Sequence, residues 1–313
     1  MNPAGKPSPL KTQTRRQFLV SAGAAAASVG WYEPSHAKLL AASEPGSMAH
    51  RELIDTNVTL SRWPGRRLPL DDTTLLAKKL RRQGVTQAWT GTFDGLLHKD
   101  LAAANARLVE ECHKHGRGLL VPFGSINPRL SGWQNDLRRC AREHRMPGIR
   151  LHPNYHNYKL SDPVFEELLR AATAKGLVVQ VVLVMEDERM QHRLMQVPHV
   201  EVGPLTAVLK ALPTARVQLL NWFRAARFEL LAKLATAGNV CFDIATLEGV
   251  GGIENLVKQV PLSRVVFGSN SPLFYFEAAK LKLRESNLDE NALMTISWKN
   301  ARSLLSCSST SPR

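Results

Sequence analysis

The sequence predicts a single (β/α)8 TIM barrel, a fold of the α/β class. From Glu52 onward, short β-branched or apolar runs alternate with longer stretches of helical periodicity, an alternation typical of parallel β/α units. Eight such units can be counted, which suits a barrel domain of about 250 residues. A doubly wound open sheet is the alternative, but no Gly-x-Gly-x-x-Gly motif follows the first predicted strand.

The elements follow from the period of the apolar residues. The predicted strands cover residues 52–57, 85–90, 119–124, 148–152, 178–183, 217–221, 240–244 and 264–268. The predicted helices cover residues 72–83, 101–115, 132–144, 163–174, 205–212, 225–237 and 253–260, with a last helical set over 276–304. Asp72 is expected to cap the first helix, while Gly116, Gly176 and Gly238 are expected at helix C-termini.

An export signal is predicted over residues 1–37. A basic stretch precedes an apolar run over residues 18–29, and Ser35-His36-Ala37 offers a small-residue cleavage site. Thr14-Arg15-Arg16-Gln17-Phe18-Leu19 resembles the twin-arginine signal. An apolar run of about 12 residues is too short to span a bilayer of roughly 30 Å. We therefore expect cleavage rather than an anchor, and a periplasmic or cell-envelope location.

Three further segments complete the predicted organisation. Residues 38–50 are expected to be flexible, residues 51–305 to form the barrel, and residues 306–313 to be a flexible tail. The signal would be removed with its apolar run, so no membrane association is expected of the mature chain. A homo-oligomer stays open as a possibility.

Cysteines and charge narrow the possible partners. The four cysteines include no Cys-x-x-Cys pair. Cys112, Cys140 and Cys241 are therefore expected to be buried thiols, whereas Cys307 lies in the exposed tail.

The formal charge of +14 would suit nucleic acid, but basic residues such as Lys78 and Arg81 are scattered on helical faces without interleaved aromatics. We expect a basic surface that favours small anionic molecules.

Active sites of (β/α)8 barrels lie at the C-terminal ends of the strands. The stretch Gly148 to His156 is typical of such an end, because an apolar run finishes in Arg150, His152, Tyr155 and His156. Each predicted strand supplies polar residues to this face, although any of them could instead cap a loop. The others are Asn57, Thr59, Thr90, Asp94, Ser125, Asn127, Gln180, Glu186, Asp187, Arg189, Asn221, Arg224, Asp243, Glu248, Asn270 and Ser271.

Three of these strand ends carry a resemblance to a known family. Ile54-Asp55-Thr56-Asn57-Val58-Thr59 stands where the family has Ile-Asp-x-His-x-His, and Gly148-Ile149-Arg150-Leu151-His152-Pro153 matches its Gly-(Ile/Val)-(Lys/Arg)-Leu-His-Pro strand. Phe267-Gly268-Ser269-Asn270-Ser271-Pro272 matches its Phe-Gly-Ser-Asp-x-Pro. The chain thus resembles the amidohydrolase-related barrels, a branch that includes aminocarboxymuconate-semialdehyde decarboxylase and metal-free dicarboxylate lactonases.

The resemblance implies a divalent metal site in members that retain its ligands. Those ligands are two histidines of strand 1, a histidine of strand 5 and an aspartate of strand 8, assisted by a histidine of strand 6. Here Asn57 and Thr59, Gln180, Asn270 and Asn221 stand on these strands. Neutral amides and a hydroxyl are weak substitutes for such ligands, so we expect no metal ligands and no cofactor.

Roles can be proposed for the polar residues that stand on this face. His152, Asp243 and Asn270 are the catalytic candidates, with His152 as general acid or base. Substrate-binding roles are expected for Asn57, Thr59, Arg150, Tyr155, Gln180, Arg189, Asn221 and Arg224. The loop after the first strand contains Arg62 and Trp63, which could form a lid, or Trp63 could anchor the loop in the core.

Our main hypothesis from the sequence is a metal-independent hydrolase that cleaves a lactone or ester-like bond in a small anionic compound. The first alternative is a catalytically silent barrel that binds a small molecule. The second is a decarboxylase or amidohydrolase with a relocated metal site built from His152, His156 and Asp243.

Overall fold

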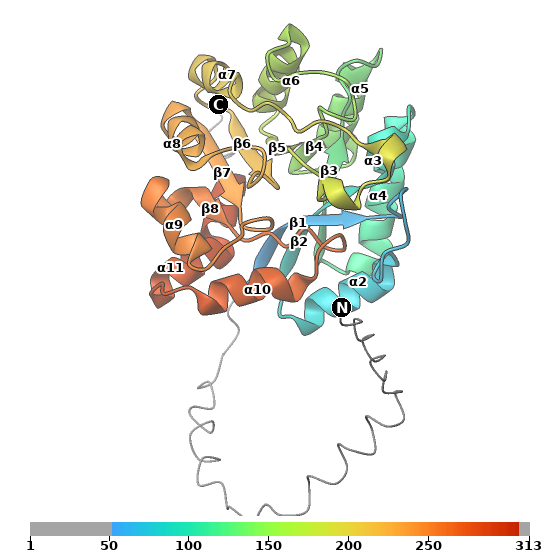
Figure 1. Cartoon of the computed structure of the whole chain (residues 1–313). Helices are drawn as coiled ribbons and strands as arrows, with labels where there is room; N and C mark the ends of the chain where they lie inside the picture. The colour runs from blue at the N-terminus through green and yellow to red at the C-terminus, as the bar shows by residue number, and fades with distance from the viewer. Residues whose placement is uncertain (1–51, 307–313) are drawn as a thin grey trace, which may run out of the picture. The chain divides into compact units, whose positions relative to one another are not determined.

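A computed structural model describes residues 52–306 and shows a barrel of eight parallel strands. Strands that are consecutive in the sequence are neighbours in the barrel (Figure 1). They are β1 (Ile54–Leu60), β2 (Gln87–Thr92), β3 (Leu120–Ser125), β4 (Gly148–Leu151), β5 (Val178–Val182), β6 (Arg216–Leu220), β7 (Asn239–Asp243) and β8 (Val265–Val266). The predicted (β/α)8 barrel is therefore confirmed.

The barrel closes between β1 and the segment that follows β8. The Thr56 backbone N–H donates to the Phe267 carbonyl at 3.0 Å, and the Thr59 N–H donates to the Ser271 carbonyl at 2.9 Å. β8 is shorter than the predicted strand because the Phe267 N–H donates to Ile296 of the C-terminal helical segment. This closure places the segment after β8 beside β1.

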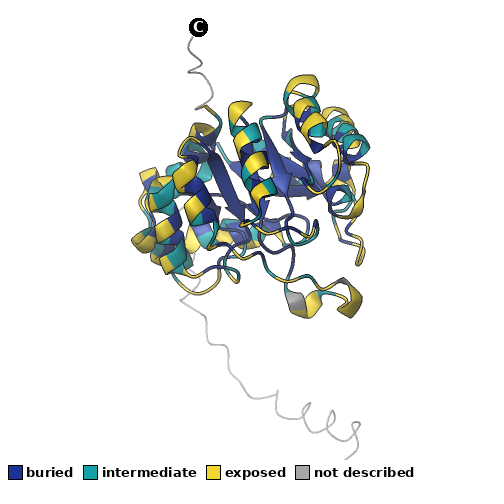
Figure 2. Ribbon diagram, turned by 90° about the horizontal axis from the view of Figure 1, so that it is seen from above, coloured by how far each residue is buried: buried dark blue, intermediate teal, exposed yellow. Residues whose placement is uncertain are grey.

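Helices surround the strands, with their buried faces toward the barrel (Figure 2). They are α2 (Thr73–Arg82), α3 (Asp94–Leu97), α4 (Leu101–Gly116), α5 (Trp133–Arg138), α6 (Pro163–Ala174), α7 (Leu205–Ala211), α8 (Phe228–Ala237), α9 (Gly252–Gln259), α10 (Phe276–Glu285), α11 (Glu290–Met294) and α12 (Asn300–Ser306). Asp72 caps α2 as predicted, because its Oδ1 accepts a hydrogen bond from the Leu75 N–H at 2.9 Å.

Two predicted helices are interrupted. The helix expected over 132–144 is α-helical only to Arg138 and continues as a π-helical turn from Arg139 to Glu143. The set expected over 276–304 breaks after Glu285, and Asp289 caps the following helix through the Ala292 N–H at 2.7 Å. Capping residues inside a long helical pattern therefore mark a real boundary.

The barrel interior has an apolar floor at the amino ends of the strands. Ile54 and Val178, the first residues of β1 and β5, pack there with Trp89, Phe123 and α12. Trp89 and Phe123 stack with ring centroids 5.0 Å apart. Polar side chains are thereby left for the middle of the barrel and its carboxyl end.

The structure tests some of the segment predictions. Cys112, Cys140 and Cys241 are buried free thiols, as predicted. The predicted signal, the segment 38–50, Cys307 and the tail from 307 lie outside the described residues. Within residues 52–306, no helix combines the length and apolar character that a membrane crossing requires.

Candidate active site

A layer of polar side chains crosses the middle of the barrel. Arg150 on β4, Gln180 on β5 and Gln218 on β6 occupy one register across three neighbouring strands. Gln180 Nε2 donates to Gln218 Oε1 at 2.9 Å and to the Thr56 carbonyl at 2.8 Å. Gln218 Nε2 in turn donates to Thr56 Oγ1 at 2.7 Å. Buried polar groups need such partners, so this layer is part of the fold's core.

Arg150 lies within this layer rather than on the rim. The residue is only 1% exposed, and its guanidinium donates to Gln180 Oε1 at 2.8 Å and to the Val58 carbonyl at 2.7 Å. Further bonds reach Thr59 Oγ1 at 3.1 Å and the Trp89 carbonyl at 3.1 Å. Arg150, Thr59 and Gln180, for which substrate contacts are predicted, bond to one another or to the backbone in this structure, and their predicted contacts with a substrate stay a prediction.

Asn57, Asn221 and Asp243 form a hydrogen-bonded triangle at the carboxyl end of the barrel. Asn57 Nδ2 donates to Asn221 Oδ1 at 2.9 Å and to Asp243 Oδ2 at 2.7 Å. The Asn221 backbone N–H donates to Asp243 Oδ1 at 3.1 Å. All three residues are buried. The structure thus brings together three residues that sequence reasoning assigned to one face.

A second buried carboxyl group, that of Asp55, lies next to this triangle. Asp55 Oδ1 accepts the backbone N–H groups of Asn57 and Ser269, and Asp55 Oδ2 accepts the Ser269 hydroxyl at 2.5 Å. Burial raises the pKa of Asp55 to about 7 and the pKa of Asp243 to about 6. Sequence reasoning missed Asp55 as a site residue, although the strand-1 motif contains it.

Two asparagines hold the segment that follows β5. Asn221 and Asn270 have left-handed backbones, with φ of 57° and 56°, which asparagine tolerates better than most residues. Asn221 Nδ2 donates to the Val184 carbonyl at 2.8 Å, and Asn270 Nδ2 donates to the Met185 carbonyl at 3.3 Å. The amide of Asn270, a predicted catalytic residue, is therefore used to position this segment.

An apolar cap, defined here as Trp63, Leu68, Phe93, Leu96, Val182, Met185 and Leu220, packs over the barrel mouth. Trp63 is 5% exposed and meets Phe93 edge to face, with ring centroids 5.2 Å apart. Arg66, from the same loop as Trp63, forms an ion pair with Glu186 of the segment after β5. The loop after β1 is therefore anchored by a buried tryptophan and closes the mouth.

His152 and His156 lie beside the cap at the end of β4, with ring centroids 6.0 Å apart. A ring nitrogen of His156, Nε2, bonds to the Gly95 carbonyl at 2.8 Å. The Nδ1 atom of His152 has no hydrogen-bond partner among the described residues. Burial lowers the pKa of both side chains, so both imidazoles are neutral at pH 7. Tyr155 follows them and packs against the apolar cap.

Arg189 and Arg224 lie at the outer edge of the mouth. Arg189 Nη2 pairs with Asp187 at 2.6 Å, and Arg224 contacts Asp187 at 3.2 Å and Glu248 at 3.1 Å. Arg224 also lines a cavity of about 30 Å³ together with Asn221 and Met185. This volume suits a water molecule and is too small for an aromatic acid.

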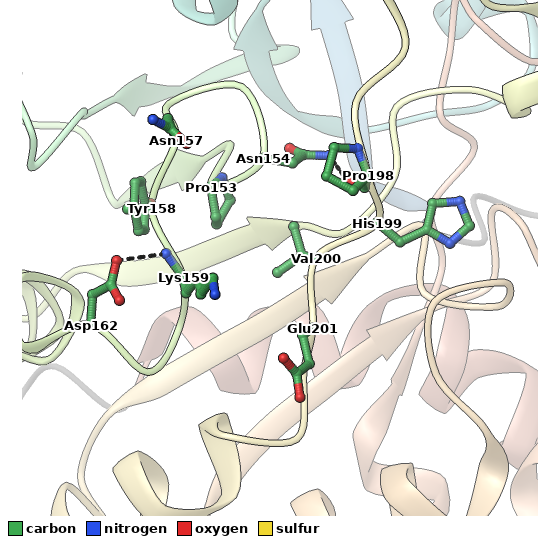
Figure 3. Close-up of a pocket in the computed structure, with 10 residues that line it drawn as sticks. All are labelled: Pro153, Asn154, Asn157, Tyr158, Lys159, Asp162, Pro198, His199, Val200 and Glu201. Atoms are coloured by element: carbon green, nitrogen blue, oxygen red, sulfur yellow. Dashed lines mark hydrogen bonds between the residues drawn. The ribbon is translucent and has the colours of Figure 1, made fainter.

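A larger hollow of about 410 Å³ lies outside the mouth, between the segment after β4 and the segment before α7. Tyr158 and Asp162 come from the first segment, while His199 and Glu201 come from the second (Figure 3). Its lining includes no predicted catalytic or substrate-binding residue. The predicted residues gather inside the barrel and at its mouth instead.

The sequence of this barrel matches a known family. Residues 49–306 match the family model described as amidohydrolase. The chain belongs to the amidohydrolase family. No curated protein matches this chain in sequence.

Solved structures share the barrel at low sequence identity. 5-Carboxyvanillate decarboxylase LigW from Sphingomonas paucimobilis is 13% identical with a TM-score of 0.63, covering 82% of this chain and 99% of that chain. Dihydroxybenzoic acid decarboxylase from Polaromonas sp. JS666 is 13% identical with a TM-score of 0.64, covering 82% and 97%. 5-Carboxyvanillate decarboxylase from Novosphingobium aromaticivorans DSM 12444 is 13% identical with a TM-score of 0.62, covering 81% and 95%.

These structures overturn the expectation that no cofactor is used. The Polaromonas and Novosphingobium decarboxylases were crystallised with bound manganese. The precedent for this fold is therefore a divalent metal, and the loss of histidines on the strands was not sufficient ground for predicting a protein without a cofactor.

The donor atoms in this barrel are arranged differently from a metal site. Among residues 52–306, no group of three or more His, Cys, Asp or Glu side chains could hold a metal ion. Carboxylate and carbonyl oxygens are suitable ligands for manganese. Here both Asp243 oxygens and Asn221 Oδ1 already accept hydrogen bonds from Asn57 and Asn221. The residues present do not fit a manganese ion in this arrangement.

Proposed function

We propose that this member of the amidohydrolase family binds a small aromatic carboxylate at the barrel mouth and catalyses its decarboxylation. The observation that carries the proposal is the buried Asp243 carboxyl, held between Asn57 and Asn221 with a pKa raised to about 6. The similar structures named above are decarboxylases. They give no support to the lactone or ester hydrolysis that the sequence alone favours.

The reaction breaks the bond between the ring carbon and the carboxylate carbon. The electron pair of that bond stays on the ring carbon, carbon dioxide leaves, and a proton must be added to the ring. An acid with a pKa near the working pH is suited to deliver and recover this proton. Asp243 is assigned this role, and the neutral imidazole of His152 is assigned a hydrogen bond to the substrate.

Substrate binding requires the mouth to open. The 30 Å³ cavity beside Asn221 has to grow, which requires Met185 in its lining to move, and Met185 packs in the apolar cap together with Trp63. Arg224 lines the cavity and is assigned the role of binding the substrate's negatively charged carboxylate. Once the cap closes again, the apolar surroundings disfavour the charged carboxylate relative to neutral carbon dioxide.

The test is release of carbon dioxide from 2,6-dihydroxybenzoate and 5-carboxyvanillate, with and without added manganese. Turnover by the native protein, lost in Asp243→Asn and kept in the exposed control Glu285→Gln, is the expected result. Circular dichroism and thermal unfolding of each variant separate a lost role from a lost fold. No release from either acid under both conditions, or full activity in Asp243→Asn, would contradict the proposal. A parallel panel of lactones tests the hydrolase alternative.

A second candidate function is binding without turnover. Two observations favour it: the apolar cap closes the mouth, and the side chains of the triangle already bond to one another. The site is therefore stable without a reacting group. Thermal stabilisation by an aromatic carboxylate without carbon dioxide release would select this alternative.

A further inference from the structure

A second surface feature lies on the outer side of the barrel, away from the mouth. Helices α2 and α4 are in contact there (Figure 1), and a hollow of about 330 Å³ lies between them. Its lining residues are Thr74, Lys78, Arg81, Lys114, His115 and Arg117. The sequence shows Lys78 and Arg81 as members of a scattered basic surface, whereas the structure gathers them with Lys114 and Arg117.

Hydrogen bonds fix three of the residues that line the hollow. Thr74 Oγ1 and His115 Nδ1 lie 2.9 Å apart. Arg81 donates to the backbone carbonyls of His115 and Gly116, at the end of α4. These bonds join the two helices across the hollow, so its walls are held together from both sides.

Basic residues at helix C-termini have an ordinary explanation, because the terminal carbonyls attract positive charge. Arg81 serves that purpose here through its bonds to two terminal carbonyls. This explanation does not account for the other basic residues of the lining, Lys78, Lys114 and Arg117. None of the three forms an ion pair with another residue between 52 and 306. No carboxylate side chain lines the hollow, although the Glu111 carboxylate lies 3.9 Å from the His115 ring, so three positive charges in the lining have no ion-pair partner among residues 52–306.

We propose that this hollow binds a phosphate-class anion carrying two or more negative charges. Lysine ammonium groups and arginine guanidinium groups are the common recognition elements for phosphate oxygens. The volume is at the low end of small-molecule sites, which suits a diphosphate or a phosphomonoester head. The anion is either a free phosphate compound or the headgroup of an anionic lipid, since both present the same oxygens.

The test measures binding of inorganic pyrophosphate to the full chain by calorimetry. Lys114→Gln combined with Arg117→Gln removes two exposed charges from the hollow. Lys175→Gln combined with Arg142→Gln removes the same charges from other exposed positions and is the matched control. We expect the first pair to weaken binding about tenfold or more and the control pair to leave it nearly unchanged.

Vesicles distinguish the two sources of phosphate. The same variants are sedimented with phosphatidylglycerol vesicles and with phosphatidylcholine vesicles. Vesicle binding that needs phosphatidylglycerol and is lost only in the first pair identifies a lipid headgroup, while pyrophosphate binding alone identifies a free compound. Absence of binding in both arms, or equal weakening by the two pairs, would overturn the proposal. Equal weakening would show that the net charge of +14, rather than this hollow, attracts anions.

Discussion

At the scale of single residues, the buried carboxyls make stability depend on pH. Asp55 has a native pKa of about 7 against an ordinary value of 3.8. The native state therefore holds this proton more tightly than the unfolded chain does. The resulting stabilisation is fully present below pH 3.8 and is lost as the pH rises through 7.

Asp55→Asn should remove this dependence. The asparagine oxygen can accept the same backbone N–H groups, and its amide can donate to the Ser269 hydroxyl, which already bonds to Ser271. Between pH 4 and pH 8 the free energy of unfolding should fall in both proteins. We expect the fall in the variant to be smaller than the fall in the native protein, by on the order of 3 kcal/mol. Urea unfolding across this range measures it, with Glu285→Gln as the exposed control. Parallel pH curves for native and variant protein would contradict the expectation.

Arg150 is the second residue whose burial has a measurable consequence. Arg150→Lys removes the planar guanidinium and leaves the Gln180 oxygen and the carbonyls of Val58 and Trp89 competing for one ammonium group. We expect a loss of about 2 to 4 kcal/mol in unfolding free energy, typical of breaking a buried charged network. Urea unfolding tests this. The exposed Arg142→Lys is the control, and an equal effect in both variants would refute a buried role for Arg150.

At the scale of elements, the apolar cap joins the loop after β1 to the segment after β5. Trp63→Ala should cost about 3 kcal/mol of stability, as for other buried aromatics, and should free the segment that contains Met185. Hydrogen exchange over residues 183–188 is the readout. Trp133→Ala, another buried tryptophan outside the cap, should destabilise the protein without selectively raising exchange there. If both variants accelerate exchange at 183–188 equally, the cap does not control that segment.

Most of the strands and several residues of the candidate site could be predicted from the sequence. The strands β2 to β7 were predictable to within two residues, because buried parallel strands are short, continuous apolar runs bounded by turns. The residues at the carboxyl ends were also predictable, and Asn57, Asn221 and Asp243 do meet there. The inward placement of Arg150 was not, because it depends on partners such as Val58 and Trp89, far away in sequence. The cap likewise depends on two loops that meet only in the folded barrel.

At the scale of the whole molecule, the twin-arginine signal remains a prediction about where the protein works. Arg15→Lys combined with Arg16→Lys should retain the protein in the cytoplasm of a host that has this export route. Lys6→Gln combined with Lys11→Gln leaves the arginine pair intact and should still be exported. Cell fractionation followed by mass measurement of the mature N-terminus tests location and cleavage together. Export of the first variant at the native level would exclude this route.

The amide of Asn57 is shared between Asn221 and Asp243, and this sharing constrains how the mouth can change over evolutionary time. A substitution at any one corner leaves a buried donor or acceptor without its partner. Drift at the three positions should therefore be correlated. A designer who wishes to install new chemistry here would have to replace the three residues as a set.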